Sequence, residues 1–94
     1  MSNILKDMFV PFVRRKDLIN VDFLRKSRDI KPHKRRLEHA MKLGNTGKQK
    51  VGIIFESRNG ILRTNTTIWM VGTEYVLVKG NIAIPIDSIL EIRI

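Results

Sequence analysis

The chain has 94 residues, with 18 Lys and Arg against nine Asp and Glu, a net charge of +9 and no cysteine. Its length excludes a large cleft-bearing enzyme fold such as an α/β barrel, and the missing cysteine excludes disulfides and thiol chemistry. A basic excess of this size in so short a chain predicts a polyanionic partner. No apolar run approaches the roughly 18–20 residues that cross a bilayer, so we expect a cytoplasmic protein without a membrane partner.

The charge divides the sequence into two parts. Residues 1–50 hold 14 of the 18 basic and five of the nine acidic residues, and therefore carry the whole net charge. Residues 51–94 hold four of each and are rich in β-branched and apolar residues. We predict a basic N-terminal arm over residues 1–31, partly extended or helical, followed by a helix and a small β domain over residues 32–94.

A short helix is expected from Pro32 to Leu43. Proline suits the first turn of a helix, and a glycine at position 44 suits the residue after its end. Leu37, Ala40 and Met41 follow the spacing of one helical face, so this narrow apolar stripe can plug one mouth of a barrel. The next residues, Gly44–Lys50, read as a loop because two glycines, an asparagine and a threonine interrupt the pattern.

The neutral half predicts five short strands. Val51, Ile53 and Phe55 share one face of a strand, and Asn59-Gly60 after it is a strong hairpin signal. The run 61–71 is long for one strand, so a bend is expected within residues 64–67. Three further strands are expected at residues 75–78, 82–86 and 90–94, with one 3₁₀ turn inside residues 85–89. The fold class is therefore mainly β, a five-stranded, strongly bent antiparallel barrel preceded by a short α-helix and a basic N-terminal arm.

The last strand runs to the C-terminus as an apolar edge. An unprotected edge of this kind invites pairing with another strand, so a homo-oligomer formed through the barrel edges is one expected assembly.

Basic residues are the candidate site residues, because Lys and Arg neutralise phosphates and release counterions from nucleic acid. The predicted RNA phosphate-binding residues are Arg14, Arg15, Lys16, Arg25, Lys26, Arg28, Lys31, Lys34, Arg35, Arg36, Lys48 and Lys50. Trp69 and Tyr75, the only Trp and the only Tyr of the chain, can stack on bases if they face solvent. For Trp69, however, the apolar neighbours favour a core position. Phe55 is expected in the core.

No catalytic group is expected. His33 and His39 are six positions apart, too far for two ligands on one helical turn, and no third ligand stands near them. No nucleophile, base and orienting group can be assembled from the remaining residues. We therefore predict no catalytic residue, no metal, no cofactor and no small-molecule substrate.

Two stretches of the β half resemble a known family. Lys50–Gly60 (KVGIIFESRNG) is similar to the first strand and turn of the Sm-like fold, in particular its bacterial Hfq-like RNA-chaperone branch. Glu74–Asn81 (EYVLVKGN) is similar to the third strand of that fold, and Ile84–Ile89 lies where its second Sm motif would be. The resemblance covers residues 37–94 and implies a small Sm-like or SH3-like barrel that binds RNA.

The sequence also departs from that family. The Lys-His pair that contacts uridine in the family's ring pore has no counterpart, because Ile86-Asp87 occupies that place. The basic arm also has no counterpart there. A compact β body with a basic extension is similar in general plan to small ribosomal proteins. The resemblance thus implies a non-catalytic RNA-binding protein, with ribosomal or small RNA and ribosomal-protein neighbours as expected partners.

Two other functions stay open at this point. The barrel edges can make the chain a protein–protein interaction module. The charge alone is also compatible with DNA binding.

Overall fold

The structure is a computed structural model that describes residues 10–26 and 29–94. A 3₁₀ helix, η1 (Arg15–Asn20), precedes the α-helix, α2 (Lys31–Gly47). Six strands follow: β1 (Val51–Ser57), β2 (Gly60–Thr66), β3 (Ile68–Val71), β4 (Tyr75–Val78), β5 (Ile82–Pro85) and β6 (Ile89–Arg93). A short 3₁₀ turn, η2 (Ile86–Ser88), joins the last two strands, as predicted.

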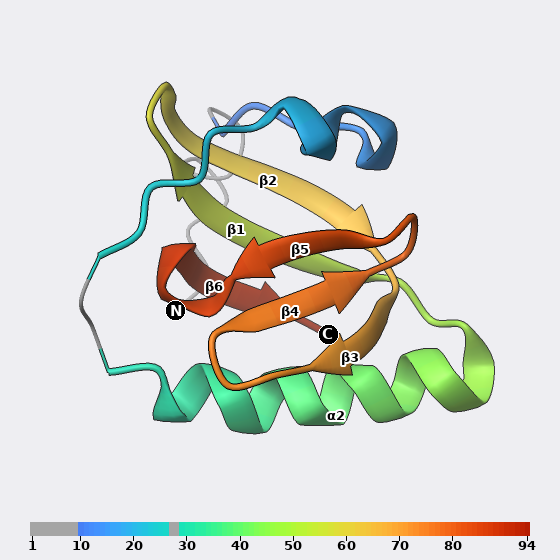
Figure 1. The fold of residues 1–94 in the computed structure, drawn as a ribbon. Helices are drawn as coiled ribbons and strands as arrows, with labels where there is room; N and C mark the ends of the chain where they lie inside the picture. Colours follow the sequence, from blue (N-terminus) through green and yellow to red (C-terminus); the bar gives the residue numbers. More distant parts are fainter. Residues whose placement is uncertain (1–9, 27–28) are drawn as a thin grey trace.

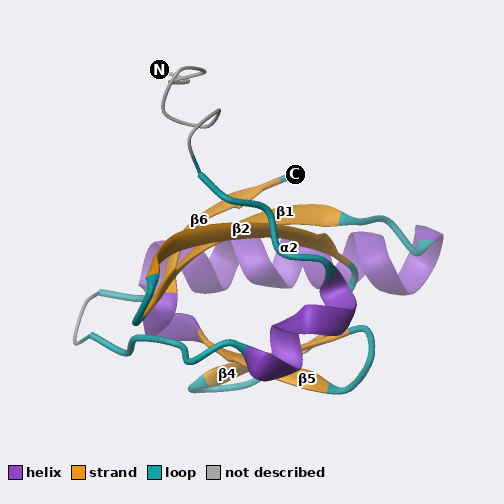
Figure 2. Ribbon diagram, turned by 90° about the horizontal axis from the view of Figure 1, so that it is seen from above, coloured by secondary structure: helices purple, strands orange, loops and turns teal. Residues whose placement is uncertain are grey.

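The strands form two antiparallel sheets of three strands each, in the orders β2-β1-β6 and β3-β4-β5. Figure 2 shows β1, β2 and β6 on one side and β4 and β5 on the other. The predicted β1–β2 hairpin is confirmed: Ser57 pairs with Gly60, whose φ of 117° suits a glycine.

The mainly β fold is confirmed, but the strands form two sheets where the sequence predicted one five-stranded barrel. Within the described residues the strands number six, and no ladder joins the two sheets. Residues 61–71 were predicted to form one bent strand, and the bend is confirmed. At Thr67, however, the chain leaves one sheet and enters the other. At this crossing the backbone N–H of Lys79 donates to the carbonyl of Thr67 at 2.9 Å, so the crossing residue bonds to the second sheet.

The core lies between the two sheets. Fully buried side chains come from both, among them Ile53 and Phe55 of β1 and Val76 and Val78 of β4. The prediction that Phe55 belongs to the core is confirmed. Leu18 of η1 covers this core from one side and α2 covers it from the opposite side (Figure 1). A body this small buries little surface, so both covers contribute a large share of the apolar burial.

The helix is longer than predicted. The apolar stripe is confirmed, since Leu37 and Ala40 are fully buried and Met41 packs against the core. However, α2 continues through Gly44 and ends at Gly47. Gly44 therefore lies inside the helix and is not its cap. Its role is to let α2 come close to β3, since a Cβ at this position would lie 2.6 Å from the carbonyl oxygen of Ile68. The predicted loop is correspondingly shorter.

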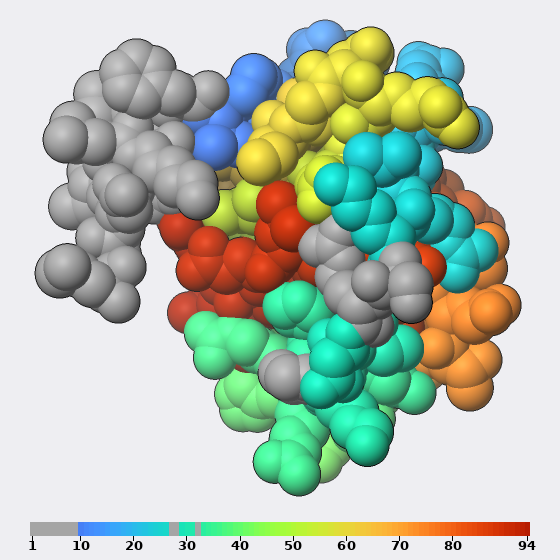
Figure 3. All heavy atoms as spheres, turned by 90° about the vertical axis from the view of Figure 1, so that its left-hand side faces the viewer, coloured from blue at the N-terminus to red at the C-terminus, as the bar shows by residue number. Residues whose placement is uncertain are grey.

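Residues 10–26 pack against the sheets. Residues 11–13 run along the free edge of β2, where Val13 donates to the carbonyl of Arg63 at 2.8 Å and Arg63 donates to that of Pro11 at 3.0 Å. Phe23 packs on Phe55, with ring centroids 5.1 Å apart. Figure 3 shows residues 21–26, in cyan, against the yellow β1–β2 hairpin. The domain boundary placed after residue 31 stays a prediction, but residues 10–26 make extensive contact with the β body.

None of the helices in the described part of the chain has the length and apolar character that crossing a bilayer requires.

Candidate functional site

Two adjoining hollows are lined by residues of the β2–β3 crossing and of the β4–β5 turn. These two backbone segments lie at the right-hand end of Figure 1. The first measures about 350 Å³ and the second about 280 Å³. They share Lys50, Thr67 and Lys79, so we treat them as one feature, the basic groove. Its lining residues are Phe12, Arg14, Arg15, Gly44, Lys48, Lys50, Asn65, Thr66, Thr67, Trp69 and Lys79.

The N-terminal segment brings two arginines to the groove. Because residues 11–13 follow the edge of β2, Arg14 and Arg15 arrive beside the end of that strand. The hydroxyl of Thr64 fixes this segment further by donating to the carbonyl of Val13 at 2.7 Å. A Cβ on Gly80 would lie 3.1 Å from a terminal nitrogen of Arg15, so the guanidinium rests on the glycine of the β4–β5 turn.

The end of α2 supplies the lysines of the opposite wall. Lys48 ends the helix in the left-handed conformation, with φ of 52°, and its N–H donates to the carbonyl of Gly44 at 2.9 Å. This is an αL cap, a position that glycine usually takes because a side chain there costs about 1 kcal/mol. The chain therefore keeps a lysine beside the groove where glycine would be more stable, and Lys50 follows two residues later.

The groove is cationic throughout. Its lining holds two arginines, three lysines and no carboxylate. Arg14 shares an exposed pair with Asp17 at 3.3 Å, a contact of the kind that contributes at most about 1 kcal/mol. Within residues 10–26 and 29–94, no ion-pair partner reaches the other four cations, which are Arg15, Lys48, Lys50 and Lys79. Uncompensated charge in a concave site concentrates positive potential and attracts anions.

Uncharged polar atoms complete the first hollow. Asn65, Thr66 and Thr67 line it at the end of β2. The hydroxyl of Thr66 is the buried side-chain polar atom that has no hydrogen-bond partner in the described part of the chain. Because this hydroxyl is itself buried, it is an unsatisfied polar atom beside the hollow rather than an exposed contact for a ligand.

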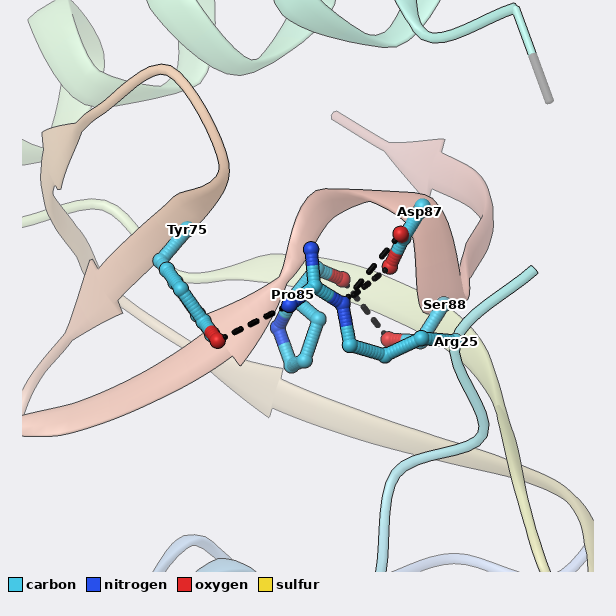
Figure 4. A network of polar contacts seen from close by, with 5 residues as sticks. All are labelled: Arg25, Tyr75, Pro85, Asp87 and Ser88. Atoms are coloured by element: carbon cyan, nitrogen blue, oxygen red, sulfur yellow. Dashed lines mark hydrogen bonds and ion pairs between the residues drawn. The ribbon is translucent and has the colours of Figure 1, made fainter. Parts of the chain in front are cut away.

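Arg25 and Lys26 are predicted site residues that are held by carboxylates of the β body. The Nε of Arg25 donates to both carboxylate oxygens of Asp87, at 3.0 and 3.2 Å, and one terminal nitrogen donates to the hydroxyl of Tyr75 at 3.0 Å (Figure 4). The hydrogen bond that Arg25 donates to the Asp87 carboxylate raises the pKa of Arg25 above its ordinary value. Lys26 pairs with Glu56 at 3.1 Å. These contacts fasten residues 21–26 to the sheets, and phosphate binding by the two cations stays a prediction.

The remaining predicted cations lie elsewhere. Lys31, Lys34, Arg35 and Arg36 belong to the N-terminal half of α2, away from the groove, and the Nε of Arg36 donates to the carbonyl of Ile92 at 2.6 Å. Lys16 is exposed on η1 without lining the groove. Arg28 lies outside the described residues.

Trp69 and Tyr75 are both exposed. The expectation that Trp69 belongs to the core is wrong, because the residue is 41% exposed and lines the second hollow. Tyr75 lies elsewhere, under the guanidinium of Arg25, which is 5.0 Å from its ring centroid. Base stacking by either residue stays a prediction.

Sequence reasoning missed Lys79, Phe12 and the polar residues at the end of β2. Lys79 had one local signal, since it is the only basic residue between positions 64 and 92 and immediately precedes a Gly-Asn turn. The others had none, because their role depends on where β2 meets the N-terminal segment.

No three His, Cys, Asp or Glu residues of the described chain gather as metal ligands would. In the comparisons with known proteins, no family model, curated protein or solved structure matches this chain.

Proposed function

We propose that this chain is a non-catalytic RNA-binding protein whose basic groove holds the RNA backbone. One observation carries the proposal: five cationic side chains from the N-terminal segment, the end of α2 and the β4–β5 turn meet in one concave site that has no carboxylate in its lining. A phosphate chain is the polyanion whose repeating charges suit such a row of cations, and each neutralised phosphate releases counterions.

The absence of catalysis in this proposal rests on the chemistry of the groove. Its lining contains amides, hydroxyls, ammonium and guanidinium groups, but no carboxylate or imidazole that would shuttle protons near neutral pH. These groups suit binding of phosphate and ribose better than bond cleavage.

The proposal extends to the fold. Counting β2 and β3 as one strand bent at Thr67 gives five strands in the continuous order β6-β1-β2/β3-β4-β5. This order supports an open Sm-like or SH3-like arrangement. Ring formation through strand edges, association with the ribosome and a cytoplasmic location stay predictions. The edge of β2 is already occupied by residues 11–13, so a partner strand would have to use another edge.

The test compares two double variants with the same loss of charge. Lys50→Gln with Lys79→Gln removes two cations of the groove, whereas Lys31→Gln with Arg35→Gln removes two exposed cations of α2. Binding to a fluorescently labelled, mixed-sequence single-stranded RNA of 12 nucleotides is measured by anisotropy at several salt concentrations. We expect the groove variant to lose about tenfold or more in affinity, and the slope of log K against log salt to become shallower by about 1.4.

The α2 variant should bind nearly as tightly as the unmodified chain. Equal losses in both variants would contradict the groove and favour diffuse attraction to net charge. Absence of RNA binding by the unmodified chain at low salt would overturn the proposed function, and tighter binding of a DNA oligonucleotide of the same sequence would reassign the polymer to DNA.

A further inference from the structure

We infer that the nucleic acid in the basic groove is single-stranded and that one of its bases stacks on Trp69. This inference rests on the proposed function and names the form of RNA that the site takes. It depends on how β3 presents the indole, on what surrounds it, and on which exposed rings are free.

Trp69 lies on the outer face of β3, and a β-bulge at this residue turns its neighbour Met70 outward as well. In the β3–β4 ladder Ile68 pairs with Val78, but Met70 pairs with Leu77, so the register shifts at the tryptophan. The usual alternation of faces is therefore broken: Ile68 is fully buried, whereas Trp69 and Met70 are 41% and 60% exposed. Bulges commonly re-aim a side chain near functional sites.

Trp69 lines the second hollow of the groove. That hollow of about 280 Å³ is lined by Trp69 together with Lys48, Lys50 and Lys79, and Gly44 contributes no side chain to fill it. An apolar ring among three ammonium groups matches a nucleotide, which carries a flat base and a phosphate within one unit. A phosphate alone would gain nothing from the ring.

Among the exposed aromatic residues of 10–26 and 29–94, Trp69 is the one whose ring has no ring or cation contact. The ring of Phe12 lies 5.3 Å from the guanidinium carbon of Arg63, and the ring of Tyr75 lies 5.0 Å from that of Arg25. No cation or second ring contacts Trp69 in the part of the chain that the structure describes. A base can therefore stack on the indole without displacing an internal contact.

An exposed indole selects unpaired bases. In a duplex the bases are stacked on each other, and side chains reach only their edges, whereas a single strand offers its π-faces to aromatic residues. Stacking of this kind tolerates any sequence, so we expect little preference among bases.

Trp69 is the only tryptophan, so its fluorescence reports on the site directly. The full chain is titrated with an unlabelled, mixed-sequence single-stranded RNA of 12 nucleotides and with the duplex of the same sequence. We expect the single strand to quench the emission and the duplex to leave it nearly unchanged. Trp69→Ala should lower single-strand affinity about fivefold to hundredfold, and Trp69→Phe should restore most of it.

Met70→Ala is the matched control, because it removes the adjacent, more exposed apolar side chain, which does not line the groove. The affinity of Met70→Ala for the single strand should stay within about twofold of that of the unmodified chain, a smaller change than the loss of a stacked base would cause. The salt dependence of RNA binding by Trp69→Ala should also be unchanged, since the indole contacts no phosphate.

RNA binding without quenching, with Trp69→Ala binding normally, would overturn the stacking but leave the proposed function intact. Equal quenching by the duplex would overturn selectivity for single strands, whereas failure of every RNA to bind would defeat the proposed function itself.

Discussion

Two glycines of α2 have opposite roles although they lie three residues apart. Gly44 faces β3, where an added Cβ would lie 2.6 Å from the backbone oxygen of Ile68 and 3.0 Å from a methyl group of Thr67. Backbone atoms cannot move aside as the end of a long side chain can. Gly47 has no neighbour within 4 Å of the same position. The first glycine therefore sets the distance between α2 and the sheet, and the second is a helix residue of low propensity.

We predict that Gly44→Ala lowers the free energy of unfolding by about 1–3 kcal/mol, because overpacking forces α2 away from β3. The matched Gly47→Ala should raise it by up to about 1 kcal/mol through helix propensity. Thermal melts followed by circular dichroism measure both, with about 4–8 °C expected per kcal/mol in a domain of this size. Equal melting temperatures for the two variants would refute the close approach.

The 3₁₀ helix η1 contributes an apolar side chain to the core in addition to its basic residues. Leu18 is fully buried between the sheets, while its neighbour Ile19 is 75% exposed. The same element begins at Arg15, which lines the groove. One short element thus joins the apolar core to the cationic site, since burial of Leu18 orients the segment that presents the arginine.

Leu18→Ala should destabilise the fold by about 2–5 kcal/mol, the usual cost of a cavity at a fully buried leucine. Ile19→Ala serves as its control, with an expected change below about 0.5 kcal/mol, because an exposed side chain leaves no cavity. Urea unfolding measures the free energy of unfolding of both variants, and an unchanged m-value shows that the two can be compared directly. A loss of equal size at both positions would mean that η1 is not anchored through Leu18.

At the scale of the whole molecule, the basic N-terminal segment and the β body share one set of contacts. Residues 11–13 cover the edge of β2, Phe23 packs on Phe55, and Arg25 reaches Asp87. Residues 10–26 therefore contribute to the same core and sheet edges as the β body. The cations of the groove come from both halves of the chain, because Lys79 belongs to the neutral half.

Removal of residues 1–26 should abolish cooperative unfolding rather than release an intact β domain. The truncated chain would expose the core beside Leu18 and leave the edge of β2 unpaired, and a domain this small has little stability to lose. A thermal melt followed by near-ultraviolet circular dichroism distinguishes the outcomes. A sharp transition within a few degrees of that of the full chain would contradict our account.

Local patterns in the sequence determined much of the fold. Alternation in residues 51–57, the Asn59-Gly60 hairpin, the bend before position 68 and the apolar stripe of α2 were all predictable, because each depends on neighbours within a few positions. The basic excess and its restriction to the first half were equally plain. The end of α2 was not, because the requirement for glycine at position 44 comes from close approach to β3 and not from a helix cap.

Only the tertiary structure decided which charges meet. The carboxylate that holds Arg25 lies 62 positions away, and Lys79 joins Arg15 through a turn that no local pattern connects to it. The joint exposure of Trp69 and its neighbour Met70 likewise depends on a register shift against β4. A linear sequence records how much charge and apolar surface a chain has, whereas long-range pairing determines where that charge remains uncompensated and which ring faces solvent.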